Sequence, residues 1–286
     1  MIDSVDRGNS PTMRRRRLAA MLRGARADSG LTREQVADHM EWSVSKLYRL
    51  EYGRTSASWR DVRELCELYG VRSPDKDALM QLARDSRKRG WWSEYEDVFP
   101  RNFPGFEAEA SVIRSYETEL VPGLLQTEDY ARAVIRALVP AASGDEIDRR
   151  VAARLARQAI LDVAEPPEIT YILNEAVLIR CLAAGRDLAA GQLAALRTAS
   201  ERPHVTIRVL PHDTGLHAGM EGAFVIMSFP EAADPDVAHV EGLMGSLFVE
   251  SVEGVGRYTL AWERLSDVAL TVGESRELLD AELKRV

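Results

Sequence analysis

Cysteine is scarce in this 286-residue chain, which holds only Cys66 and Cys181. Each stands alone in an apolar helical context, so we expect neither a disulfide framework nor a zinc site built on cysteine pairs. No stretch approaches the roughly 20 apolar residues needed to cross a bilayer, and no apolar run of signal-peptide length follows Arg14–Arg17. These absences predict a soluble, cytoplasmic protein with no membrane partner.

Patterns typical of catalysis are also missing. The sequence has no glycine-rich phosphate loop, no Gly-x-Ser-x-Gly elbow and no cysteine–histidine nucleophile pattern. Histidines late in the chain lie near Asp213 and Glu241, and such side chains could bind zinc or non-haem iron. The spacing His212-x4-His217 places these two residues in a glycine-containing turn rather than on one helical face, without an obvious third ligand. We therefore expect no metal, no cofactor and no enzymatic activity. The histidines concerned are His204, His212, His217 and His239.

Charge is divided unevenly along the chain. The net charge of −8 is unusual for a nucleic-acid-binding protein, but residues 1–72 hold 14 basic and 10 acidic side chains. The remaining residues therefore carry a net charge of −12. A basic DNA-reading domain joined to an acidic sensing or partner-binding domain would have this asymmetry. The length suits one small domain followed by one of ordinary size.

Two short amphipathic segments, each preceded by a hydroxyl residue, lie close together near the N-terminus. Thr32 and Gln35 have the spacing of a capping box that opens a helix, and Ser43 opens the next helix. Further helices are expected to begin near Leu18 and after Ser58. This is the layout of a helix-turn-helix, whose second helix enters the major groove of double-stranded DNA.

A plainer interpretation is that these are four short helices of a small core with a solvated basic face. The caps, the short turn and the basic outward face coincide, which favours DNA binding. For Arg14–Arg17 the solvated start of a helix is the favoured interpretation, and contact with phosphate or the minor groove is the alternative.

The chain is expected to divide into four parts. They are a disordered tail (1–13), an all-α helix-turn-helix domain (14–72), a charged helical connector (73–90) and a larger α+β domain with a small sheet (91–286). Within the last part, strands are expected at 169–173, 205–210 and 223–229 and as a pair near 237–240 and 246–250, whereas 107–118 has a helical pattern. The aromatic stretch 91–106 most simply anchors an irregular segment on a core; the alternative is a ligand cage or a stacking platform for single-stranded nucleic acid.

Segment 16–72 resembles the Cro/phage-repressor class of helix-turn-helix domain, also called the xenobiotic-response-element class. The resemblance rests on Gly30-Leu31-Thr32, Ala37, Ser43-x-Ser45, Arg49-Leu50-Glu51 and Gly53. It implies a structural ion pair between Arg26 and Glu51. It also implies DNA contacts, with base edges for Val44, Ser45 and Arg49, and with the phosphate backbone for Arg33, Ser43, Lys46 and Arg54.

The chemistry of these side chains suits the implied roles. Arg49 can donate a bidentate pair to guanine O6 and N7, which is worth about 1–3 kcal/mol of base discrimination. Ser45 would read bases weakly, and the Val44 isopropyl group either contacts a thymine methyl or packs inward. Basic side chains on phosphates would make binding fall steeply with salt through counterion release.

The second part of the chain holds a further set of motifs: Trp91-Trp92, Pro122-Gly123-Leu124-Leu125-Gln126-Thr127, Arg154-Leu155-x-Arg157-Gln158, Asn174-Glu175-Ala176 and Val209-Leu210-Pro211. In these motifs, residues from about 90 to 283 resemble a domain that follows Cro-type modules in actinobacterial WhiJ-like regulators, which are described as antitoxin-like transcription factors. The resemblance implies a repressor acting with a small partner protein encoded nearby, and no catalytic residues.

The sequence therefore predicts a cytoplasmic, sequence-specific DNA-binding repressor. A homodimer is expected, because one small recognition helix reads few bases and paired half-sites about one helical turn apart are the common solution. Two alternatives stay open. One is an antitoxin-like protein whose main task is to mask a small neighbouring protein, and the other is a sensor whose larger domain encloses a small molecule.

Overall fold

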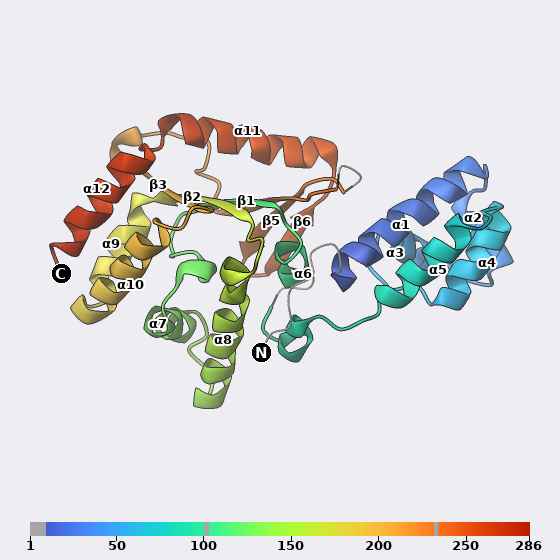
Figure 1. Ribbon diagram of the computed structural model, residues 1–286, viewed down its shortest axis with the longest axis horizontal. Coiled ribbons are helices and arrows are strands. Elements are labelled where there is room, and N and C mark those ends of the chain that lie inside the picture. The colour runs from blue at the N-terminus through green and yellow to red at the C-terminus, as the bar shows by residue number, and fades with distance from the viewer. Residues whose placement is uncertain (1–9, 100–102, 232–233) are drawn as a thin grey trace. The chain divides into compact units, whose positions relative to one another are not determined.

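The structure is a computed structural model that describes residues 10–99, 103–231 and 234–286. The chain forms two compact units, Met1–Glu109 and Ala110–Val286. Figure 1 shows the first as helices alone and the second as a sheet with helices around it. The predicted fold class, a helical helix-turn-helix domain followed by an α+β domain, is confirmed.

Three helices of the first unit start at the predicted caps. The Thr32 hydroxyl accepts a hydrogen bond from the Gln35 backbone N–H, and the Gln35 side chain accepts one from the Thr32 N–H. Ser43 and Ser58 cap the next two helices through backbone N–H groups of their first turns. Each such cap stabilises a helix by about 1 kcal/mol. The helices are α1 (Pro11–Asp28), α2 (Arg33–His39), α3 (Val44–Glu51), α4 (Trp59–Tyr69) and α5 (Asp75–Asp85).

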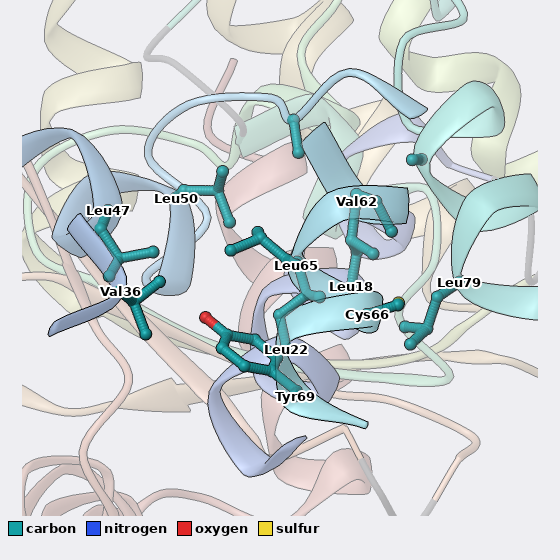
Figure 2. Close-up of a cluster of buried hydrophobic side chains, with 12 residues drawn as sticks. Leu18, Leu22, Val36, Leu47, Leu50, Val62, Leu65, Cys66, Tyr69 and Leu79 are labelled. Carbon is teal, nitrogen blue, oxygen red and sulfur yellow. The ribbon is translucent and has the colours of Figure 1, made fainter. Parts of the chain in front are cut away.

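One cluster of buried apolar side chains holds these five helices together (Figure 2). Leu22, Leu47 and Leu65, from three different helices, are fully buried. Burying a side chain of this size contributes about 1.5–3 kcal/mol. Leu79 and Ala83 of α5 belong to the same cluster, so the segment expected as a connector over 73–90 supplies a core helix instead. The compact unit accordingly extends to Glu109, past the boundary expected at residue 72.

α1 begins at Pro11 rather than near Leu18, so residues 10–13 of the tail expected over 1–13 are ordered, while residues 1–9 lie outside the described part of the chain. Proline suits the first helical position, where its missing N–H has no partner to lose, and the Ser10 hydroxyl accepts from the Thr12 N–H. Met13 is fully buried. The four arginines that follow interrupt the apolar period, which is why the sequence pattern did not show this first turn.

Those arginines are half-buried rather than solvated. Burial lowers the pKa of Arg15. The Arg16 guanidinium lies 5.8 Å from the centre of the Phe106 ring in α6 (Phe103–Glu107), and Arg14 Nη1 lies 3.8 Å from an Asp85 carboxylate oxygen. The solvated helix start favoured from the sequence is therefore wrong, because these side chains serve packing within the first unit.

The aromatic stretch before α6 packs on itself. It contains η1 (Trp91–Tyr95), and the Trp91 ring meets Tyr95 and Phe99 edge to face, with centroids 6.4 and 5.9 Å apart. Edge-to-face pairs of this kind stabilise packing beyond the area that they bury. These aromatic side chains therefore contact one another within the segment, and its anchoring on a core stays a prediction.

The second unit is built on a six-stranded mixed sheet in the order β3-β2-β1-β4-β5-β6. β1, β2 and β3 are parallel, and β4, β5 and β6 continue antiparallel from β1. The parallel β2–β3 pair is joined by helices, as parallel strands require a crossover. The strands are β1 (Val112–Glu117), β2 (Glu168–Asn174), β3 (Val205–Leu210), β4 (Phe224–Ser228), β5 (Val237–Gly242) and β6 (Gly245–Val249).

The long helix α11 covers one face of this sheet. Tyr116, Phe224 and Ile226 of the sheet form an apolar cluster with Trp262 and Leu265 of that helix. Residues that alternate with these along the strands, such as Ser115 and Glu117, face the other way. The helices of this unit are η2 (Gly123–Leu125), α7 (Glu128–Leu138), α8 (Gly144–Arg157), η3 (Gln158–Asp162), α9 (Glu175–Ala183), α10 (Arg186–Ala199), η4 (His212–Thr214), α11 (Val252–Val268) and α12 (Val272–Leu283).

The helix expected over 107–118 is wrong, because residues 112–117 form β1. This strand lies in the interior of the sheet, paired with β2 on one side and with β4 on the other. Both of its faces carry side chains that face other parts of the unit, so the strict apolar–polar alternation of a half-exposed strand is lost. The other strands expected from the sequence lie at or within one or two residues of their predicted positions.

Candidate nucleic-acid interface

A tight turn joins α2 to α3. Glu41 in this turn has φ 53°, in the left-handed region that non-glycine residues rarely adopt. The Trp42 backbone N–H donates to the Ala37 carbonyl at 2.8 Å, which closes the turn. The backbone therefore bends sharply enough for Ser43 to open α3 only a few residues after α2 ends.

α3 has one buried face and one exposed face. Leu47 and Leu50 point into the helical core (Figure 2), whereas Ser45, Lys46 and Arg49 are exposed. Ser43 and Arg54, at the two ends of the helix, are exposed as well. The structure thus brings these predicted contacts together on one helix and its flanks.

Val44 also lies on the exposed side, with 40% of its surface accessible. Of the two possibilities left open by the sequence, inward packing is not what the structure has. An exposed isopropyl group at the first position of α3 has a thymine methyl as its natural contact on DNA.

Glu51, the last residue of α3, is buried and links this helix to the rest of the unit. Its carboxylate is fully buried and accepts from Arg26 Nε at 2.5 Å and from Arg33 Nε at 2.7 Å. Arg26 also donates to the Leu31 carbonyl at 2.8 Å, and Arg23 donates to the Glu51 backbone carbonyl at 3.1 Å. The pair Arg26–Glu51 implied by the resemblance is therefore present, and it joins α1 to the end of α3.

Arg33, which the resemblance placed on a phosphate, has a structural contact as well. Its side chain is 30% exposed, and its hydrogen bond with Glu51 is the main reason that its pKa is raised. A phosphate contact through the exposed part of the guanidinium stays a prediction. The structure adds that Arg33 ties α2 to α3.

The sequence interpretation missed two tyrosines, Tyr48 on α3 and Tyr52 at its C-terminal cap. The rings of Tyr48 and Tyr52 lie 4.3 Å apart, and arginine guanidinium groups lie over their faces at 5.2–5.7 Å: Arg23 over Tyr52, Arg54 over Tyr48, and Arg33 over both. We refer to these five residues as the tyrosine–arginine stack. Contacts of this kind are worth about 0.5–1 kcal/mol at exposed sites. They hold Arg54 beside α3 in a defined position. The spacing of Tyr48 and Tyr52, one helical turn apart, was the available signal.

Tryptophans position further basic groups in this unit. Lys46 Nζ lies 3.6 Å from the centre of the Trp42 ring. Trp59, at the start of α4, has the guanidinium groups of Arg60, Arg63 and Arg84 at 5.4, 5.7 and 5.4 Å from its ring. Of these contacts, the one between Trp59 and Arg84 joins residues that are far apart in the sequence, whereas the others join residues at most four positions apart.

The late histidines do not assemble a metal centre in the described part of the chain, where no group of three potential ligands occurs. His239 of β5 is buried against Phe248, with ring centroids 4.7 Å apart. Burial lowers its pKa to about 4. His212 is exposed in η4.

Two families of domains match the sequence. A domain of unknown function (DUF5753) matches residues 100–281, and a helix-turn-helix domain matches residues 17–80. The chain belongs to the DUF5753 family. The helix-turn-helix match covers α1 to α4 and the start of α5, in agreement with the place of α5 in the helical core. Comparisons with curated proteins and with solved structures gave no match.

The helix-turn-helix domain marks this DUF5753 protein as a DNA-binding regulator. None of the described helices is both long enough and apolar enough to span a bilayer.

Proposed function

We propose that this protein is a cytoplasmic, sequence-specific transcriptional repressor that inserts α3 into the major groove of double-stranded DNA. The observation that carries the proposal is the division of α3 into two faces. Leu47, Leu50 and Glu51 anchor the helix, while Ser45 and Arg49 are free to meet base edges. In helix-turn-helix domains the second helix of the motif lies in this groove.

Basic side chains on and beside α3 would supply affinity for DNA that does not depend on its sequence. Lys46 and Arg54 are exposed and held by Trp42 and Tyr48. Ordered basic side chains lose less conformational freedom when they bind than free ones do. We propose that they contact phosphates on either side of the bases that Arg49 reads.

We further propose that the protein acts as a homodimer, because one α3 reads too few base pairs for a unique operator. The hairpin of β5 and β6 is the surface that we propose for pairing of two copies. β6 is the edge strand of the sheet, and at the hairpin tip Leu243 and Met244 are completely exposed, with Leu247 60% exposed. Apolar side chains on an unpaired edge strand favour association with a second strand.

The larger domain gives the finer assignment. Its likeness to WhiJ-like, antitoxin-like regulators supports a repressor of the xenobiotic-response-element class that works with a small partner protein encoded nearby. We propose binding and regulation, rather than catalysis, as the role of this domain. Masking of a toxic neighbouring protein is the alternative, and it predicts that the function survives loss of DNA binding.

The test uses the full chain and fragments of DNA from the region around its own gene. Wild-type protein is expected to retard one fragment and to reduce transcription from it in a purified system, and the triple variant Ser45→Ala, Lys46→Ala, Arg49→Ala to do neither. The matched control, Arg136→Ala on the exposed end of α7, should behave as wild type. Equal retardation by the triple variant would contradict the proposal.

A further inference from the structure

A second group of charged side chains lies in the DUF5753 domain, on the side of the sheet away from α11. Ser115 and Glu117 of β1 alternate with Tyr116, which packs toward α11. Arg154 and Arg157 lie one turn apart near the C-terminal end of α8, the helix seen below the sheet in Figure 1. The positive charge of Arg157 acts to lower the pKa of the Glu117 carboxyl.

Arg154 is the unusual member of this group. Its Nη1 donates to the Gln126 side-chain carbonyl at 2.6 Å. Among the described residues, no carboxylate oxygen lies within 4.0 Å of its guanidinium. Burial, and then the positive charge of Arg157, lower the pKa of Arg154 to about 10, and the negative charge of Glu241 in β5 opposes this shift. A half-buried guanidinium that bonds a neutral amide rather than a carboxylate is costly, and proteins normally pair such groups with an anion.

The segment around η2 lies against both arginines and is itself held by hydrogen bonds. The Gln126 amide donates to the Val121 carbonyl at 2.6 Å, which fixes the oxygen that Arg154 uses. Gln158 donates to the Gly123 and Gln126 carbonyls at 3.2 and 2.7 Å. A Cβ on Gly123 would lie 3.1 Å from Arg157 Nη1, so glycine leaves room for that guanidinium. These hydrogen bonds fix backbone and amide groups on which Arg154 and Arg157 lie.

Glu117 completes the group from the sheet. Its carboxyl accepts from the Ser115 hydroxyl at 2.8 Å. Burial raises the pKa of Glu117 to about 7, while Ser115 and Arg157 oppose the rise and Glu241 of β5 adds to it. Both Glu117 and Arg154 nevertheless retain accessible surface. A small molecule can therefore reach groups that the protein keeps partly away from water.

We propose that Arg154, Arg157 and Glu117 form a binding site for a small molecule that carries a carboxylate or phosphate group, with its oxyanion on Arg154. Guanidinium groups bind both kinds of oxyanion in a bidentate manner. The Glu117 carboxyl, which the buried Ser115 hydroxyl holds in place, would hydrogen-bond a polar group on the remainder of the molecule. The site would make the DUF5753 domain the sensor of the regulator, so its regulatory meaning rests on the proposed function.

The test measures the thermal unfolding midpoint of the full chain, without DNA, in sodium phosphate and in sodium succinate against sodium chloride of equal ionic strength. A ligand that binds only the folded state raises the midpoint with its concentration. We expect a saturable rise with at least one of the two anions. A rise with phosphate but not with succinate would assign a phosphate ligand, and the reverse a carboxylate ligand.

Two variants make the test specific. Arg154→Gln should abolish the anion-dependent rise, whereas Arg136→Gln on exposed α7 should keep it. Glu117→Gln should lower the anion concentration needed for half of the rise several-fold, because the amide keeps a hydrogen-bonding group and removes a negative charge that repels the anion. A rise that is unchanged in Arg154→Gln, or no saturable rise in wild type, would overturn the proposal. If Arg154→Gln does not fold, Glu117→Gln alone tests the proposal. An unchanged anion concentration for half of the rise in that variant would then overturn the proposal.

Failure of this proposal and failure of the proposed function can be told apart. Anion binding is measured here without DNA, and DNA retardation can be measured without the anions. Arg154→Gln that retards DNA normally but gives no anion response supports both proposals. If the protein binds the anion normally but does not bind DNA, the binding-site proposal stands and the proposed function as a DNA-binding regulator is contradicted.

Discussion

Arg26 and Glu51 are joined by a hydrogen bond of 2.5 Å between Nε and Oε1, although 25 residues separate them in the sequence. Arg33 reaches the same carboxylate from α2 at 2.7 Å. Three elements of the helix-turn-helix domain therefore meet at one buried charge. This charge therefore ties α3 to both α1 and α2.

Glu51→Ala should destabilise the helical domain by about 3–5 kcal/mol, because removing one partner of a buried ion pair leaves an uncompensated charge. Urea unfolding of the full chain, followed by circular dichroism, measures this as a lower midpoint for the helical unit. Glu64→Ala, an exposed carboxylate on α4, is the matched control and should change the midpoint little. Equal midpoints for the two variants would refute the role given to Glu51.

Glu41→Gly should stabilise the protein by up to about 1 kcal/mol. Its φ of 53° costs a non-glycine residue roughly 1–2 kcal/mol, and the greater freedom of glycine in the unfolded chain offsets part of the gain. Glu34→Gly in α2, where φ is helical, should instead destabilise the protein by about 1 kcal/mol. Two variants that shift the midpoint in the same direction would argue against a strained turn.

Arg54→Ala should weaken DNA binding about equally for all sequences and reduce the slope of log K against log salt by about 1, because one phosphate contact is lost. Fluorescence anisotropy from 50 to 200 mM salt gives the slope. Tyr48→Leu removes the ring that supports Arg54 but keeps its charge, and it should reduce affinity less. An unchanged slope in Arg54→Ala would place this arginine away from the backbone.

Glu117→Gln should make the larger domain more resistant to unfolding at high pH. The pKa of Glu117 is raised from 4.5 to about 7, so the folded state holds a proton that the unfolded state has lost. Wild-type stability therefore falls as pH rises from about 4.5 to 7, by about 1–3 kcal/mol, and the glutamine variant lacks this loss. The charged groups beside Glu117, Arg157 of α8 and Glu241 of β5, are present in both proteins. A difference in unfolding free energy that stays constant from pH 4.5 to 8 would contradict the raised pKa.

Local chemistry made much of the DNA-binding unit predictable. Thr32, Ser43 and Ser58 cap helices through atoms only two or three residues away, and short-range bonds of this kind are readable in the sequence. The contacts Ser45, Lys46 and Arg49 were implied by the resemblance to Cro-type domains, and all three are exposed on α3. The apolar period alone would have placed Val44 inward with Leu47 and Leu50, but Val44 is exposed.

Other features depend on contacts between distant segments. α5 resembled a charged connector because it leads into the charged run at 84–89. Only contact with the other helices makes Leu79 and Ala83 core residues. β1 looked helical because neighbours on both sides of the strand blur its alternation. The environment of Arg154 is set by Gln126 and by the charge of Glu241 in β5, neither of which its own helix reveals. The ion pair between Arg33 and Glu51 likewise could not be inferred from the sequence around Arg33, because it forms only in the folded chain.

Selection of DNA from a random pool of duplexes by the full chain and by Arg49→Ala tests the central claim most directly. If α3 lies in the major groove, wild type enriches one motif that contains a fixed guanine, and Arg49→Ala loses preference at that position by about 1–3 kcal/mol while keeping the rest of the motif. The same motif with the same preferences from both proteins, or no enrichment by wild type even at low salt, would contradict the account.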